Sequence, residues 1–135
     1  MNRTRIFFTE SYKYNQIANT IMENKNLPDW AFELNCAITV CDCNGVILYM
    51  NEKAKATYIK HGNLIGKNLM DCHSERSKAI IHNLLETGGQ NAYTIEKQGL
   101  KKMIYQSAWK ENGKVAGLCE ISMVIPEEMP HYVRG

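Results

Sequence analysis

Residues 37–51 read Ala37-Ile-Thr-Val-Cys-Asp-Cys-Asn-Gly-Val-Ile-Leu-Tyr-Met-Asn51. Two short runs rich in apolar residues, 37–41 and 46–50, flank the segment Asp42-Cys43-Asn44-Gly45. An Asn-Gly pair between two such runs is a strong signal for a β-hairpin, because both residues tolerate the backbone angles of a tight turn. This stretch therefore predicts two neighbouring antiparallel strands.

Three longer strands are predicted downstream, at 92–97, 101–110 and 114–125. Their connections are Gln98-Gly99 and Glu111-Asn112-Gly113, which contain the residue types that tight hairpin turns require. Side chains in the middle strand alternate in character, as expected when one face of a sheet is covered. Together with the first hairpin, these segments predict five antiparallel strands.

The chain between these two groups of strands predicts helices. A short helix is expected at 51–59, and Ser74 is a suitable N-cap for a helix that continues to about Leu85. Gly88-Gly89 is a typical helix stop. This order of elements predicts an α+β domain, with one five-stranded antiparallel sheet and short helices across one of its faces.

Residues 9–34 have helical character. An apolar stripe recurs at spacings of three and four residues, formed by Tyr14, Ile17, Ala18, Ile21 and Met22. Pro28 suits the first turn of a second short helix that carries Trp30, Phe32 and Leu34. We divide the chain into a helical extension at 1–34, a domain at 35–126 and a tail at 127–135. The stripe predicts a homodimer formed through the N-terminal helix; in the alternative, that helix folds back over its own sheet.

Length and charge restrict the classes of function. The 135 residues fit one ordinary domain, and 16 Lys+Arg against 14 Asp+Glu give a formal net charge of +2. That charge gives no electrostatic reason to expect nucleic acid or an anionic membrane as the partner. Five cysteines, without a recognisable export signal, predict reduced thiols in a cytoplasmic protein rather than a disulfide framework.

Several motifs occur in a characteristic order. Asp42 to Asn51 form a D-x-N-G-x-I-x-x-x-N pattern, Ile65 to Lys67 read I-G-K, and Gly113 to Gly117 form G-x-x-x-G before an apolar closing strand. Cys72 to Ser77 also match a C-H-x-x-x-S segment. Over about residues 36–126, this set resembles the PAS sensory-domain family.

The resemblance implies a sheet that cups a small cavity beneath its central helices. PAS domains use this cavity for haem, flavin or small metabolites, or fill it with their own side chains, and commonly signal as dimers through flanking helices. The implied function is a sensory module that binds a small molecule and acts through a separate signalling protein. The alternative is a PAS-fold scaffold for dimerisation or interaction, with no ligand.

The predicted cavity lining comes from one helix and one strand, and consists of Ile80, Ile81, Leu84, Met103, Tyr105 and Trp109. These residues can equally form an ordinary core. Buried Tyr and Trp side chains need partners for their polar ends, so Tyr105 and Trp109 can also orient a ligand.

Candidate cofactors follow from the same resemblance. The flavin photoreceptor signature has a reactive Cys directly after Gly-x-Asn, and here Leu69 follows Gly66-Lys67-Asn68. A photoadduct is therefore not expected. Haem-binding PAS domains ligate iron through a His on a central helix, which makes His82, or His73 at the cavity mouth, the candidate ligand.

Metal binding and catalysis have weaker signals. Cys41, Cys43, Cys72 and His73 offer soft ligands, but their spacing fits no standard zinc module. The sequence contains no nucleophile elbow, P-loop or H-E-x-x-H motif. We therefore expect neither a metal site nor an enzyme.

Overall fold

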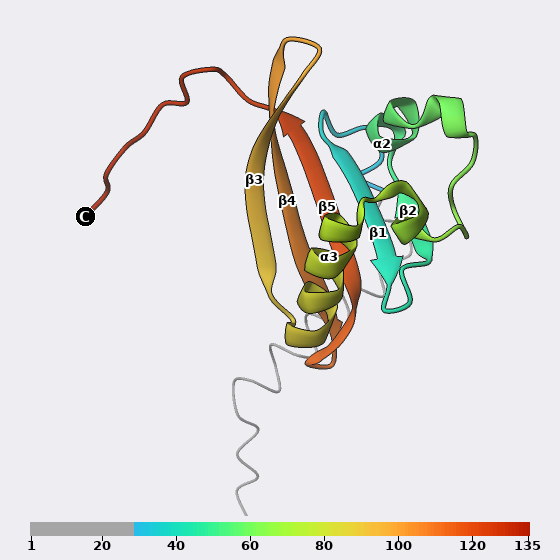
Figure 1. Ribbon diagram of the computed structural model, residues 1–135. Coiled ribbons are helices and arrows are strands. Elements are labelled where there is room, and N and C mark those ends of the chain that lie inside the picture. The colour runs from blue at the N-terminus through green and yellow to red at the C-terminus, as the bar shows by residue number, and fades with distance from the viewer. Residues whose placement is uncertain (1–28) are drawn as a thin grey trace, which may run out of the picture. The chain divides into compact units, whose positions relative to one another are not determined.

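A computed structural model of the chain describes residues 29–135 (Figure 1). The chain divides into two units, Met1–Trp30 and Ala31–Gly135, and the fold below is that of the second unit. The predicted N-terminal helix with its apolar stripe lies outside the described residues. The predicted boundaries at residues 34 and 126 remain predictions.

Five strands form a single antiparallel sheet. They are β1 (Ala37–Asp42), β2 (Ile47–Met50), β3 (Gln90–Lys97), β4 (Leu100–Glu111) and β5 (Lys114–Val124). Their order across the sheet is β2-β1-β5-β4-β3, so the first and last strands of the chain pair in the middle. The predicted number and antiparallel arrangement of the strands are confirmed.

The hairpin turns follow the predicted chemistry. Gln98 and Gly99 both have positive φ, as do Asn112 and Gly113, which is the backbone geometry that connects two strands with minimal splay. At the first hairpin, the Asp42 side chain accepts hydrogen bonds from the backbone N–H groups of Asn44 and Val46, at 2.9 and 3.0 Å. Local side chains therefore close this turn.

The middle of the chain is helical, as predicted. It contains α2 (Glu52–Thr57), two 3-10 turns (Ile59–His61 and Leu69–Cys72) and α3 (Glu75–Thr87). Ser74 caps α3 by accepting a hydrogen bond from the Ser77 N–H, and the helix ends at Gly88 in a left-handed conformation. Among residues 29–135, no helix is long and apolar enough to cross a membrane.

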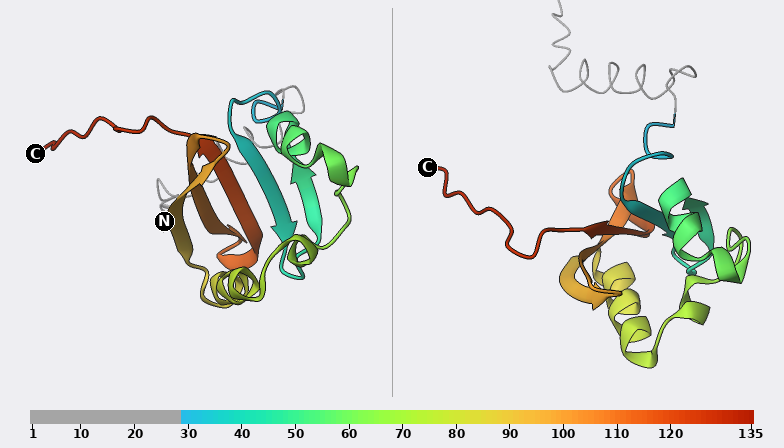
Figure 2. Two further views of the ribbon diagram at one scale, coloured as in Figure 1. Left: turned by 45° about the horizontal axis from the view of Figure 1, so that its top comes forward. Right: turned by 90° about the horizontal axis from the view of Figure 1, so that it is seen from above.

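The helices lie on one side of the sheet (Figure 2). The core between them is formed by buried residues of β1, β2, β5, both helices and the intervening loop, namely Cys41, Ile47, Met50, Ala54, Leu64, Leu69, Ile81, Leu84 and Leu118. We call the sheet face that carries Cys41 and Leu118 the inner face. The opposite face, which carries Val40, Tyr105 and Ile121, is the outer face.

Strand pairing assigns the remaining side chains to these two faces. Ala108 pairs with Leu118, and Gln106 pairs with Glu120, so alternate residues of β4 from Lys102 to Ala108 share the inner face. Side chains directly opposite each other in a sheet lie on the same face. The inner face therefore has a polar part on β3, β4 and β5, next to the apolar core.

The short helix predicted after Pro28 is wrong, because residues 30–33 form a turn. Donors at the start of α2, the N-cap residue Asn51 and the first helical residue Glu52, bind carbonyl oxygens of this turn. The Asn51 Nδ2 donates to the Ala31 oxygen at 3.0 Å, and the Glu52 N–H donates to the Phe32 oxygen at 2.9 Å. Hydrogen bonds to residues distant in the sequence thus take the place of the backbone hydrogen bonds of the predicted helix.

Candidate functional site: a cleft on the inner face of the sheet

Two neighbouring pockets occupy the polar part of the inner face. The larger has a volume of about 330 Å³ and is lined by α3 and the adjacent strands, through Arg76, Ser77, Ile80, Asn91, Tyr93 and Gln106. The smaller, of about 100 Å³, includes Thr39, Tyr58, Ile104 and Glu120. Since Tyr93 pairs with Ile104 and Gln106 pairs with Glu120, the two pockets adjoin. We call them together the inner-face cleft.

A row of three polar side chains crosses this cleft. The Asn91 Nδ2 on β3 donates to the Gln106 Oε1 on β4 at 3.1 Å. The Gln106 Nε2 in turn donates to the Glu120 Oε2 on β5 at 2.8 Å. Gln106 is only 3% exposed, and hydrogen bonds at both ends of its amide satisfy one donor and one acceptor. The row is a connected polar network, which fixes the orientation of the buried amide.

The Glu120 carboxylate is the electrostatic centre of the cleft. Within residues 29–135, no Lys, Arg or His nitrogen lies within 4.0 Å of it. Burial raises the pKa of the Tyr58 phenol, and the negative charge of Glu120 raises it further. The same two causes, in the same order, raise the pKa of Tyr93. Two neutral phenols and one carboxylate thus share the space.

The helix residues of the predicted lining have separate positions. Ile80 lines the larger pocket, with 36% of its surface exposed. Ile81 is fully buried and Leu84 is 4% exposed, and both belong to the core cluster rather than to the cleft. Of the three, the structure thus brings only Ile80 to the cleft.

The strand residues of the predicted lining lie on the other face of the sheet. Met103, Tyr105 and Trp109 alternate with the inner-face residues of β4, and they pair with Met123, Ile121 and Gly117. The predicted assignment of these three to the cavity is therefore corrected. A shift of one residue transfers a whole strand to the opposite face, and the bulky residues of β4 made the wrong face look like the core.

Trp109 does satisfy its polar end, as a partly buried indole should. Its Nε1–H donates to the Cys41 carbonyl oxygen at 2.9 Å, passing over Gly117 of the intervening strand. The interaction holds β4 against β1 on the outer face. This contact gives Trp109 a structural role in the sheet.

Gln106 and Glu120 were not predicted as site residues. The available signal was Glu120, the single charged residue inside the otherwise apolar and small run from Val115 to Val124. A charge at the centre of a sheet is rare unless it has a partner or a function. The cross-strand pairing that joins it to Gln106 cannot be read from either strand alone.

The two histidines proposed as iron ligands lie outside the cleft lining. His82 is exposed on α3. The His73 Nδ1 is 2.8 Å from the Leu69 carbonyl oxygen, which commits that nitrogen to a local hydrogen bond. Neither histidine is among the side chains that line the two pockets of the cleft. These positions do not fit an axial ligand that must point into the cavity.

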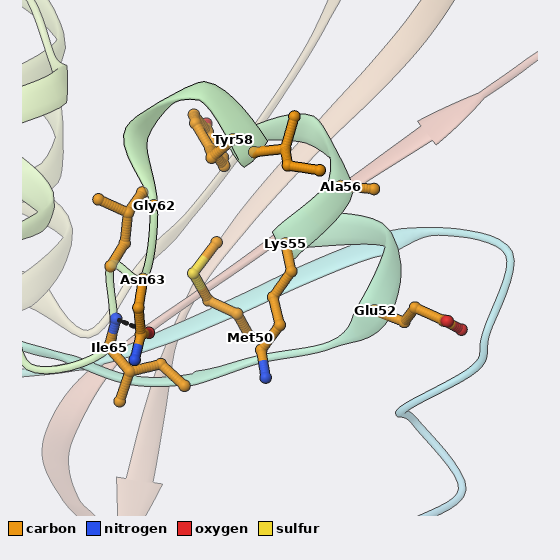
Figure 3. A pocket seen from close by; sticks show the side chains of 10 residues that line it. Met50, Glu52, Lys55, Ala56, Tyr58, Gly62, Asn63 and Ile65 are labelled. Atoms are coloured by element: carbon orange, nitrogen blue, oxygen red, sulfur yellow. Dashed lines mark hydrogen bonds between the residues drawn. The ribbon is translucent and has the colours of Figure 1, made fainter.

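A third pocket, of about 530 Å³, lies between α2 and the loop at residues 62–65 (Figure 3). Met50 reaches into it, whereas Glu52 points away. Its polar lining includes Asn63, whose Oδ1 accepts a hydrogen bond from the Ile65 N–H at 3.1 Å. Ile59, at 75% exposed, and Ile65 form an open apolar rim. The pocket lacks a buried polar network, so the inner-face cleft is the better candidate site.

The five cysteines are free thiols. Burial raises the pKa of Cys41 and of Cys119, which makes these two thiols poor nucleophiles at neutral pH. Across residues 29–135, no three His, Cys, Asp or Glu side chains gather closely enough to hold a metal ion.

Comparisons with known proteins give fold similarity alone. No family model and no curated protein matches the chain. Among solved structures, the PAS domain of histidine kinase ThkA is 20% identical, with a TM-score of 0.56, over 67% of this chain and 99% of that one. The PAS domain of a protein from Colwellia psychrerythraea is 20% identical, with a TM-score of 0.55, over 86% and 99% of the two chains.

A third similar structure is the Aer2 receptor from Vibrio cholerae, whose description is a dual PAS-heme oxygen sensor. It is 18% identical, with a TM-score of 0.52, and the match covers 67% of this chain and 95% of that one. Residues 31–135 therefore have the PAS fold.

Proposed function

We propose that this chain is a sensory or regulatory module that binds a small molecule in the inner-face cleft and passes the signal to a separate protein. The observation that carries this proposal is the row Asn91, Gln106 and Glu120, which places a hydrogen-bonded amide and a carboxylate at the wall of a cleft. PAS domains of a histidine kinase and of an oxygen sensor have the same fold, which supports a sensory role.

The polar row favours a binding cleft over a filled core. Burying an amide and a carboxylate costs free energy unless each is bonded, and an apolar core of the same shape avoids that cost. Two groups of the row can still accept hydrogen bonds from a ligand. They are the amide oxygen of Asn91 and the carboxylate of Glu120. A ligand that fills the cleft would complete these interactions.

Haem is not part of the proposal. The Aer2 receptor is described as a PAS-heme sensor, but here His82 is exposed and His73 is engaged with the backbone. The cleft instead presents phenol, amide and carboxylate groups, which suit a polar organic molecule. We propose no catalytic activity and a cytoplasmic location; the five free thiols support the location.

A homodimer is the second part of the proposal. The outer face carries partly buried apolar side chains, including Val40, Met103, Tyr105 and Ile121. Such a face favours contact with another surface, either the N-terminal stripe of the same chain or a second copy. The same observation favours the alternative function, an interaction scaffold without a ligand.

Native mass spectrometry of the purified full chain tests ligand binding and dimerisation together. We expect a dimer that carries a mass excess from a small molecule, and we expect this excess to disappear on denaturation. Ile80→Trp should fill the mouth of the larger pocket and remove the excess. Ala79→Trp, at an exposed neighbouring position of α3, should retain it.

The scaffold alternative predicts a different spectrum. A dimer whose mass equals two bare chains, also after incubation with a small-molecule extract of the source cells, would exclude the sensory proposal. A monomer with bound ligand would exclude only the dimer.

A further inference from the structure

The Glu120 carboxylate has an incomplete set of partners. Its Oε2 accepts one hydrogen bond, from Gln106, while a carboxylate can accept about four. It lies on the wall of the cleft and is half-buried. A carboxylate in such a position attracts a cation more strongly than a carboxylate in open water does.

The cationic side chains of the protein do not supply this partner. Lys102 lines the small pocket, but on β4 it is four residues from Gln106, the residue that pairs with Glu120. Four residues of a strand span about 13 Å. Lys97 also lines the small pocket, and on β3 it lies farther from Glu120 than Ile95, the residue that pairs with Lys102. Arg76 lines the larger pocket. None of the three has a nitrogen within 4.0 Å of Glu120.

The other groups around Glu120 suit an organic cation. Tyr58 lines the small pocket together with Glu120, and Tyr93 lines the larger pocket beside Gln106. Aromatic rings bind ammonium groups through their faces, and phenol oxygens accept hydrogen bonds from them. Asn91 donates with its Nδ2 toward Gln106, so its amide oxygen is a further acceptor at the cleft.

We infer that the inner-face cleft takes a ligand with a protonated amine, and that the ammonium group pairs with Glu120. This inference rests on the proposed function, because it assigns a ligand class to the same cleft. The row of Asn91 and Gln106 holds the carboxylate in place, and the tyrosines enclose the ammonium group. The larger pocket receives the body of the ligand, next to Ile80.

Benzylamine and benzyl alcohol test this inference, because they have nearly the same size and differ in charge at pH 7. Dissociation constants of both probes for the full chain come from ligand-observed NMR titrations. We expect benzylamine to bind roughly tenfold more tightly, the gain typical of a charge-assisted hydrogen bond. Glu120→Gln should remove that advantage and leave benzyl alcohol unchanged, since a glutamine oxygen can still accept from Gln106.

Glu96→Gln is the matched control. It removes the same charge from an exposed position of β3, between the inner-face residues Ile95 and Lys97 and therefore on the opposite face. Both dissociation constants should stay unchanged. The comparison of the two probes on the unmodified chain does not depend on any variant folding. Equal affinities, or no binding of either probe, would overturn the ammonium inference. Equal affinities would still leave the cleft as a candidate binding site, and bare chains in the native mass spectra would refute the proposed function itself.

Discussion

Replacing Asn51 with alanine is expected to lower the free energy of unfolding by about 4 kcal/mol. Asn51 is fully buried, and its side chain makes four hydrogen bonds. Its Oδ1 accepts from the N–H groups of Ile38 and Ala54, at 2.9 and 3.0 Å. Its Nδ2 donates to the carbonyl oxygens of Ala31 and Cys36, at 3.0 and 2.8 Å.

The size of this effect comes from the groups that alanine leaves behind. Four backbone groups lose a hydrogen bond, although the Ala31 oxygen keeps the one from the Leu34 N–H at 3.4 Å. Each buried group left unsatisfied costs on the order of 1–3 kcal/mol, reduced where water can enter. The change also removes the N-cap of α2. Asn51 thus joins the turn at residues 31–36, the start of β1 and the start of α2.

Urea unfolding monitored by circular dichroism measures this loss. Asn51→Asp keeps both accepted hydrogen bonds but places an anionic oxygen against two carbonyl oxygens, so it should also destabilise the protein by several kcal/mol. Asn83→Ala, at an exposed position of α3, is the matched control and should change stability by less than about 0.5 kcal/mol. A loss for Asn51→Ala no larger than that of the control would refute its role as the central hydrogen-bonding residue.

Replacing Gly117 with alanine is expected to cost about 3 kcal/mol of stability, because the added methyl group has no space. A Cβ at this position would overlap the Cys41 carbonyl oxygen and would lie 2.5 Å from the Trp109 Nε1. One of these contacts is with the backbone of the neighbouring strand, which cannot rotate away. The substitution must therefore separate β1 from β5, and it must also displace the indole that bonds to Cys41.

Two further variants separate the causes of this loss. Gly99→Ala, at a turn with positive φ and open space around it, should show only backbone strain, of about 1 kcal/mol. Trp109→Phe should remove the indole hydrogen bond and cost about 1 kcal/mol. If thermal unfolding shows Gly117→Ala to be no less stable than Gly99→Ala, then the close packing at this crossing does not contribute to stability.

The sequence predicted the fold well because its strongest signals are local. Asn112-Gly113 and Gln98-Gly99 determine two hairpins, and Ser74 and Gly88 determine the two ends of α3. These features depend on residues within a few positions of each other.

The site was harder to predict because it depends on contacts across strands. The alternation of side chains in β4 is visible in the sequence. Which set of alternate residues faces the helices depends on the pairing of Ala108 with Leu118 and of Cys41 with Leu118. That pairing places Gln106 inside and Tyr105 outside. The sequence pattern favours the bulky residues of β4 as the lining, whereas an amide and a carboxylate occupy the cleft.

The same limit applies to Asn51. The resemblance to PAS domains included this residue at the end of the first hairpin, but nothing in the sequence around it indicates four hydrogen bonds. Two of its partners, Ala31 and Cys36, are 20 and 15 positions away. The Ala31 carbonyl oxygen is available to Asn51 because residues 30–33 form a turn rather than the predicted helix.

The central claim is that ligands bind in the inner-face cleft, and the side-chain amide signals of Asn91 and Gln106 report on it most directly. In ¹H–¹⁵N spectra of the full chain titrated with benzylamine, these two NH₂ pairs should shift saturably with one dissociation constant. The NH₂ pair of Asn83, exposed on α3, should stay in place. Saturable shifts confined to Asn63, in the pocket between α2 and the loop at 62–65, or unchanged signals of Asn91 and Gln106, would contradict the claim.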